Sequence, residues 1–264
     1  MADTSLISFP NSRPTGGAGG KLDLLAIGVH PDDVELGCSG TIINEIKNGK
    51  IVGVLDLTQG ELGSRGTIET RYEEAAKAAM IMGVHVRENL KMRDGFFKND
   101  EEHQRKLIVA IRKYQPEIVI TNSLEDRHPD HGRAAKLTTD SCYLSGLIKV
   151  VTKDEQGNQQ EPWRPKYVFH YIQDRYHEPD FIIDISDVFE QRMDAVKAYT
   201  TQFYNPDNED DGPQTYISTS AFLDSIIARA RVIGKKIGVQ YGEGFKTEKS
   251  LGIKDLDSLI KIET

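Results

Sequence analysis

The feature that most constrains the fold of this chain is a regular alternation between short apolar runs and longer amphipathic stretches, which begins at Lys21. Short apolar runs predict buried strands, and amphipathic stretches predict helices that pack on them. The expected strands are 22–29, 51–57, 88–92, 117–121, 167–172 and 181–185, and the expected helices are 38–48, 67–82, 101–114, 131–147, 187–200 and 218–238. Because a repeated strand–helix order favours a parallel sheet with helices on both faces, we expect an α/β fold. It should be a Rossmann-like three-layer sandwich with a mostly parallel sheet in a single domain.

The first 20 residues lie outside this pattern. They mix Ser, Pro, Asn and Gly and end in the glycine-rich run 16–20. A segment of this composition buries too little apolar surface to fold, so we expect a flexible leader at 1–20 and one domain at 21–264. The polar stretch 152–161 and the turn-rich stretch 203–213 are expected to be loops.

Composition excludes several kinds of partner. The net charge of −8 comes without a basic stripe, so nucleic acid is not expected to bind. No run approaches the roughly 20 apolar residues that cross a bilayer, so no membrane association is expected.

The two cysteines, Cys38 and Cys142, are too few for a disulfide framework and are expected to be buried, as are Met80 and Met82. These features together predict a cytoplasmic protein.

Two sets of polar residues follow two of the expected strands. His30-Pro31-Asp32-Asp33 comes directly after the strand at 22–29, and His128-Pro129-Asp130-His131 follows the strand at 117–121. The carboxyl ends of neighbouring strands in such a sheet lie side by side, and ligands bind there. The two sets are therefore expected to form the two halves of one metal site.

The residue types in the two sets suit a catalytic zinc site, which has three protein ligands and one open position. His30, Asp33 and His131 would be the ligands. Asp32 would remain as a general base for a water molecule, and His128 as an acid or a donor to the developing oxyanion. This is the equipment for metal-assisted hydrolysis of an amide.

Simpler interpretations exist for each residue taken alone. Asp32 or Asp33 could cap the following helix, and either histidine could be an ordinary hydrogen-bonded side chain. The glycines at 28, 37 and 40 do not have the G-x-G-x-x-G spacing, so NAD or FAD binding is not expected. The pairing of the two sets favours the metal site over the separate interpretations.

The sequence also resembles a known family, the PIG-L/LmbE-like zinc-dependent N-acetylglucosamine deacetylases. The resemblance is carried by the segments 28–35, 125–131, 56–67 and 241–245. Within the family the chain looks most like the bacillithiol-biosynthesis enzymes that deacetylate N-acetylglucosaminyl malate. The resemblance implies zinc on His30, Asp33 and His131, Asp32 as the base, and a homo-oligomer.

The resemblance implies roles for further residues. Asp130 would orient the imidazole of His128, although a cap for the helix at 131–147 is an equal alternative. Arg71 would lie at the acetyl end of the site, unless it pairs with Glu74 on the helix surface. Tyr216 would donate to the oxyanion from a mobile loop, or simply pack on the core.

Arg127 could grip a carboxylate or a sugar hydroxyl of the substrate, or pair near Asp126. Fe²⁺, Co²⁺ or Mn²⁺ could replace Zn²⁺ on such ligands.

The sequence leaves three candidate functions. The first is deacetylation of N-acetylglucosaminyl malate; the second is hydrolysis of another N-acetylated sugar, such as a chitin fragment, or of a thiol conjugate. The third is a non-catalytic sugar- or metal-binding module.

Overall fold

The structure, a computed structural model, describes residues 6–8, 20–206 and 212–257. Within these residues one eight-stranded sheet runs in the order β1-β4-β3-β2-β5-β6-β8-β7. The strands are β1 Leu6–Ser8, β2 Leu24–Gly28, β3 Val52–Thr58, β4 Val86–Met92, β5 Ile118–Thr121, β6 Tyr167–Tyr171, β7 Phe181–Asp184 and β8 Gly242–Thr247. The five central strands, β4 to β6, are parallel, and antiparallel pairs occur only towards the two edges. The predicted α/β fold with a mostly parallel sheet is confirmed.

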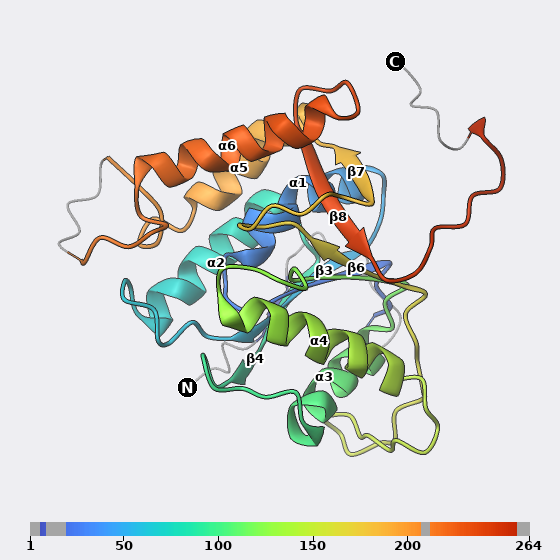
Figure 1. Ribbon diagram of the computed structural model, residues 1–264. Helices are drawn as coiled ribbons and strands as arrows, with labels where there is room; N and C mark the ends of the chain where they lie inside the picture. The colour runs from blue at the N-terminus through green and yellow to red at the C-terminus, as the bar shows by residue number, and fades with distance from the viewer. Residues whose placement is uncertain (1–5, 9–19, 207–211, 258–264) are drawn as a thin grey trace.

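Helices cover both faces of the sheet (Figure 1). One face is covered by α1 Asp33–Lys47, α2 Ile68–Met82, α5 Phe189–Lys197 and α6 Ser220–Lys235, and the other by α3 Glu101–Tyr114 and α4 Pro129–Leu144. Strand β2 separates two cores, because Leu24 and Ala26 pack on the first face while Leu25 and Ile27 pack on the second. All four side chains are buried, so β2 is the centre of the molecule.

The order of the strands determines where a ligand can bind. From β2 the chain adds β3 and β4 on one side, and then returns to add β5 and β6 on the other. The connections therefore leave β2 and β5 in opposite directions, which opens a crevice at the carboxyl ends of these two neighbours. The two predicted sets of polar residues follow these two strands.

Helix α1 begins at Asp33, five residues before the predicted start at Cys38. The difference arises because Cys38 has non-helical backbone angles, so that α1 consists of two segments. The kink leaves backbone groups without their helical partners, and side chains replace them. Glu243 accepts from the backbone N–H groups of Gly40 (3.0 Å) and Thr41 (2.7 Å), while Arg192 donates to the carbonyl of Leu36 (2.9 Å).

Other expectations also differ from the structure. Residues 6–8 of the predicted leader form β1, which pairs with β4, whereas 1–5 and 9–19 lie outside the described residues. Strand β8 was not predicted. Helix α4 begins at Pro129 instead of residue 131. Met80 is 62% exposed, because α2 buries the face formed by residues 75, 78, 79 and 82; Met82, Cys38 and Cys142 are buried as expected.

The predicted loop at 152–161 is mostly exposed and contains one isolated bridge, between Lys153 and Gln159. The predicted loop at 203–213 has no helix or strand in its described part, and 207–211 lie outside it. Among the described residues, a helix with the length and apolar character of a transmembrane span is not found.

Candidate active site

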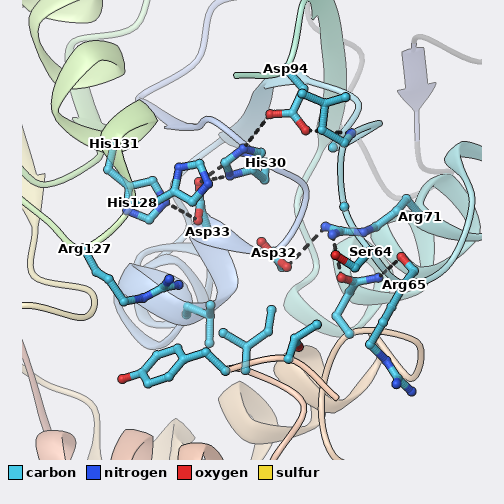
Figure 2. A pocket seen from close by; sticks show the side chains of 18 of the residues that line it. His30, Asp32, Asp33, Ser64, Arg65, Arg71, Asp94, Arg127, His128 and His131 are labelled. Atoms are coloured by element: carbon cyan, nitrogen blue, oxygen red, sulfur yellow. Dashed lines mark hydrogen bonds and ion pairs between the residues drawn. The ribbon is translucent and has the colours of Figure 1, made fainter. Parts of the chain in front are cut away.

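A cavity of about 360 Å³ opens at the carboxyl ends of the central strands. Its lining contains most of the predicted site residues: His30, Asp32, Asp33, Arg71, Arg127, His128, His131 and Tyr216. Asp130 lies directly behind the lining residue Gly95, whose N–H donates to its carboxylate (2.9 Å). Figure 2 shows the labelled side chains converging on the pocket from both sets. The two sets are therefore brought together, as the order of the strands requires.

Asp33 lies between the imidazoles of His30 and His131. Its Oδ2 is 3.5 Å from Nδ1 of His30, and its Oδ1 is 3.2 Å from Nε2 of His131. Burial would raise the pKa of Asp33, but the charges and hydrogen bonds of His131 and His30 hold it well below its usual value. Asp33 is thus a buried, ionised carboxylate with an imidazole on each side.

Each of these two imidazoles has a second carboxylate on its other ring nitrogen. His30 Nε2 is 3.0 Å from Asp94 Oδ1, and His131 Nδ1 is 2.7 Å from Asp126 Oδ2. Burial lowers the pKa of both histidines, but Asp33 and Asp94 raise that of His30 to about 10, while Asp33 and Asp126 raise that of His131 to about 9. The surroundings of both rings therefore stabilise positive charge.

These donors fit a divalent metal ion. Metal-binding histidines usually hydrogen-bond a carboxylate through the nitrogen that does not face the metal, as His30 and His131 do. One ligand nitrogen each from His30, His128 and His131 lies within 4.8 Å of the others, so His128 is a possible third imidazole ligand. Asp33 and His128 are thus the two candidates for the third ligand beside His30 and His131.

His128 has a different hydrogen bond from the other two histidines. It is the N-cap of α4, and its Nδ1 accepts from the backbone N–H of Asp130 (3.3 Å). An accepting Nδ1 carries no proton, so the neutral ring carries its proton on Nε2. Burial lowers the pKa of His128, and the charges of His30 and His131 lower it further. His128 is therefore a neutral N–H donor at the cavity wall, which favours Asp33 as the third metal ligand.

Asp32 does not cap a helix, although it occupies the N-cap position of α1. Its side chain makes no capping hydrogen bond, and its φ of 140° is rare for any residue except glycine. A backbone strained in this way costs about 1–3 kcal/mol and persists only where the surroundings enforce it. The side chain is buried in the cavity wall beside Arg71, and burial raises its pKa to about 7 against the opposing charge of Arg71. The helix-cap interpretation of Asp32 is therefore wrong.

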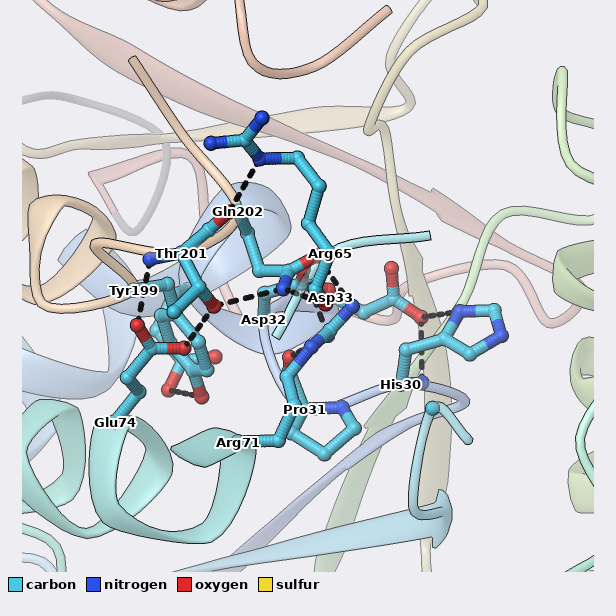
Figure 3. A network of polar contacts seen from close by, with 12 residues as sticks. His30, Pro31, Asp32, Asp33, Arg65, Arg71, Glu74, Tyr199, Thr201 and Gln202 are labelled. Carbon is cyan, nitrogen blue, oxygen red and sulfur yellow. Dashed lines mark hydrogen bonds and ion pairs between the residues drawn. The ribbon is translucent and has the colours of Figure 1, made fainter. Parts of the chain in front are cut away.

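Arg71 contacts Asp32 and not Glu74. Its Nη1 donates to Asp32 Oδ2 (3.2 Å) and to the carbonyl of Pro31 (2.8 Å), and its Nη2 donates to Gln202 Oε1 (2.6 Å). Glu74 is buried and accepts from Thr201 instead (Figure 3). The alternative of a surface ion pair between Arg71 and Glu74 is therefore wrong, and Arg71 holds the backbone and the carboxylate of Asp32 together.

Asp130 is not the cap of α4, because His128 has that position. Its carboxylate accepts from Gly95 N and from Arg133 Nη1 (2.9 Å), while its backbone N–H contacts His128. The contact that orients the imidazole of His128 is thus made by the main chain of Asp130.

Arg127 and Tyr216 lie together at the rim of the cavity. The guanidinium of Arg127 stacks on the ring of Tyr216, 4.5 Å from its centre, and Nε donates to Asp174 (2.6 Å). The hydroxyl of Tyr216 donates to the same carboxylate (3.0 Å), and the side chain is exposed. Tyr216 is thus about half exposed, its ring packs edge-on against Phe222 of the core with 5.3 Å between the ring centres, and its hydroxyl is bonded to Asp174.

Several residues that contact the predicted site residues were missed from the sequence, among them Asp94, Asn122, Asp126 and Gln173. Asp94 follows β4 and Gln173 follows β6, so the strand-end rule that found His30 and His128 also applies to them. Asp126 lies in the same loop as Arg127. A polar residue just after a strand of the parallel sheet was the available signal.

A family model and several known proteins match this chain. Residues 25–142 match the family model PIG-L, described as GlcNAc-PI de-N-acetylase. The crystal structure of the conserved protein TT1542 from Thermus thermophilus is 35% identical, with a TM-score of 0.77, over 88% of this chain and 98% of that one.

The curated relatives with named activities include a deacetylase and a hydratase. The diacetylchitobiose deacetylase of Thermococcus kodakarensis is 29% identical over 84% of this chain and 82% of its own length. The 4-oxalmesaconate hydratase of Pseudomonas putida is 26% identical over 67% of this chain and 73% of its own length. The matched segment 25–142 contains both polar sets. The similarity to the Thermus protein covers nearly the full length of that protein and most of this chain. The chain therefore belongs to the PIG-L family.

Proposed function

We propose that this protein is a metal-dependent hydrolase that removes the acetyl group from an N-acetylglucosamine conjugate. The observation that carries the proposal is the position of Asp32. Its carboxylate is buried, it does not cap α1, and it does not lie between His30 and His131 as the carboxylate of Asp33 does. A purely structural metal site closes its ligand positions with protein groups and needs no such residue. A catalytic site needs a base beside the ion.

His30, Asp33 and His131 would hold the ion. When bound, it would supply Lewis-acid polarisation of the amide carbonyl and make a neighbouring water molecule more acidic. Two imidazoles and one carboxylate suit Zn²⁺, and also Fe²⁺, Co²⁺ or Mn²⁺. Zn²⁺ is our first candidate.

The residues next to the three ligands would carry out the proton transfers and stabilise the oxyanion. Asp32 takes the proton from the attacking water, and Arg71 fixes the direction of its carboxylate. Figure 2 shows Asp32 and Arg71 on one side of Asp33, and His128 and His131 on the other. His128 donates its Nε2 proton toward the carbonyl oxygen as negative charge develops there. The C–N bond then breaks, the amine nitrogen takes the proton that Asp32 holds, and acetate leaves.

Tyr216 and Asp130 have supporting roles in this proposal. Tyr216 can assist the oxyanion only after its hydroxyl leaves Asp174, so its contribution requires a movement of the rim. Asp130 keeps His128 in the N–H donor form through its backbone.

The substrate class rests on two observations. The matching family model and the Thermococcus relative both concern N-acetylglucosamine derivatives. The guanidinium of Arg127 points toward the middle of the pocket (Figure 2) and uses Nε for Asp174. It therefore offers a bidentate site for a carboxylate, and we propose N-acetylglucosaminyl malate as the preferred substrate.

Acetate release from the Zn²⁺-loaded protein tests this function. We expect turnover on N-acetylglucosaminyl malate that exceeds turnover on diacetylchitobiose and free N-acetylglucosamine, and that stops on chelation and returns with Zn²⁺. Arg127→Gln should lower the preference for the malate conjugate and leave turnover on N-acetylglucosamine within a few-fold.

Two results would contradict the proposal. No acetate from any acetylated sugar would favour a non-catalytic binding module. Hydration of 4-oxalmesaconate without acetate release would assign the chain to the activity of its Pseudomonas relative instead.

A further inference from the structure

Two buried side-chain amides, those of Asn122 and Gln173, contact the carboxylate of Asp33. Gln173 Nε2 donates to Oδ1 (2.7 Å), and Asn122 Nδ2 donates to Oδ2 (3.2 Å). Both residues are at least nine-tenths buried. Neither the hydrolytic steps nor the fold described so far requires an amide at either position.

Both amides leave their carbonyl oxygen without a partner among the described residues. A buried acceptor without a hydrogen bond is unfavourable, because it has lost its contact with water and gained nothing in return. Rotating either amide by half a turn would place its oxygen against the carboxylate, where two acceptors repel each other. The observed orientation is therefore imposed by Asp33, and the unpartnered oxygens are its consequence.

The two oxygens of Asp33 differ in the number of donors they accept. Oδ2 accepts from the backbone N–H groups of Val29 (3.1 Å) and His30 (3.0 Å) as well as from Asn122, and it lies 3.5 Å from Nδ1 of His30. Oδ1 accepts from the amide of Gln173 and lies 3.2 Å from Nε2 of His131. Since three donors saturate Oδ2, Oδ1 is the oxygen that can still bind a cation.

We propose that Gln173 is a positioning residue that fixes Asp33 as a ligand through Oδ1 alone. The inference rests on the proposed function, because it requires an ion on His30, Asp33 and His131. The amide N–H of Gln173 on Oδ1 prevents the carboxylate from rotating about its bond to Cβ. The direction of the other lone pair of Oδ1 is therefore fixed. A ligand that uses one oxygen also leaves more of the ion open to water and substrate.

The position of Gln173 in the fold suits this role. It follows β6 by two residues, and β6 is the parallel neighbour of β5, which precedes Asn122. The donors to Asp33 therefore come from the ends of β2, β5 and β6, three adjacent strands of a rigid sheet. Hydrogen-bonding partners of metal ligands typically change metal affinity by about 10- to 100-fold.

The test replaces Gln173 with Met, which keeps the length of the side chain and removes the donor. We expect the Zn²⁺ dissociation constant, measured by competition with a chromophoric chelator, to rise by about 10- to 100-fold. The visible absorption of bound Co²⁺, which reports coordination number and geometry, should also change. Gln173→Asn, whose amide is one methylene too short to reach Oδ1, should weaken Zn²⁺ binding in the same direction.

Gln160→Met is the matched control. Gln160 is a partly buried glutamine that, like Gln173, makes one amide donation, to the carbonyl of Val109 (3.0 Å), and has an unpartnered oxygen, but it lies outside the cavity lining. It should bind Zn²⁺ within two-fold of the wild type. Wild-type affinity and an unchanged Co²⁺ spectrum in folded Gln173→Met would overturn the inference. Failure of the wild-type protein itself to bind a metal ion would instead overturn the proposed function.

Discussion

Among single residues, the hydrogen bond on one ring nitrogen of a histidine decides what the other nitrogen can do. Carboxylates bond one nitrogen of His30 and of His131, so the opposite nitrogen of each ring is available as a metal ligand. A backbone N–H bonds His128 instead, which makes its second nitrogen a donor. Three histidines that are equivalent in the sequence thus have two different chemistries.

His128→Asn separates these two chemistries. Asparagine is a good N-cap, so α4 should keep its first turn. Because His128 acts as a donor and not as a ligand, the variant should bind Zn²⁺ like the wild type and lose about 10²- to 10³-fold in acetate release. Metal analysis after dialysis, combined with the rate, checks this. Loss of the metal would show that His128 is itself a ligand and not only a donor.

The residue types of the site could be predicted from the sequence, but most of their partners could not. His30, Asp32 and Asp33 were recognisable because they directly follow the buried strand β2, and His131 because it lies at the start of the helix that comes after β5. Asp94 is 64 residues from His30, and its contact depends on how the turn after β4 folds back. The partner of Arg71 was equally open, since Glu74 is close in sequence whereas Asp32 is close only in space.

Among the elements, α1 shows how a remote strand can complete a helix. The kink at Cys38 exposes the N–H groups of Gly40 and Thr41, and Glu243 of β8 accepts both. Arg192 of α5 pairs with Glu243 (2.9 Å), and all of these groups are buried. The first segment of α1, which carries Asp33, is therefore held in place by β8 and α5.

Glu243→Gln should reveal this dependence as a loss of stability. The substitution keeps the shape but leaves the buried charge of Arg192 without its partner, so we expect unfolding in urea to require about 3 kcal/mol less free energy. Glu178→Gln, the same substitution in an exposed pair with Lys236, should cost less than about 1 kcal/mol. Equal effects of the two variants would mean that Glu243 does not support α1.

The same two elements mark the limit of prediction at this scale. The strands and helices from β2 to α4 were predictable as elements because apolar periodicity is strong there, whereas β1 lies in the segment that was expected to be a flexible leader. Strand β8 was missed because Gly242 and Gly244 weaken the strand signal, although α6 requires a glycine at 242: a side chain there would meet the backbone of Gly234 at 3.0 Å. The start of α1 was misplaced because a kink stabilised by distant side chains leaves no local pattern.

Across the whole molecule, the reversal of strand order between β2 and β5 creates the site. It brings loops about a hundred residues apart into one cavity, with Asp32 and Arg71 on one side of Asp33 and His128 on the other (Figure 2). The alternation of strands and helices predicts this meeting of the two sets, since carboxyl ends of adjacent parallel strands share an edge. The division of the residues between holding an ion and moving a proton is the central claim about this molecule.

Metal content and acetate release, measured together for Asp32→Asn and His131→Ala, test that claim most directly. Asp32→Asn should keep one metal ion per chain and lose about 10²- to 10⁴-fold in turnover, because only the base is removed. His131→Ala should lose both metal and turnover. Near wild-type turnover in Asp32→Asn, or full metal occupancy in His131→Ala, would contradict the assignment of these two residues.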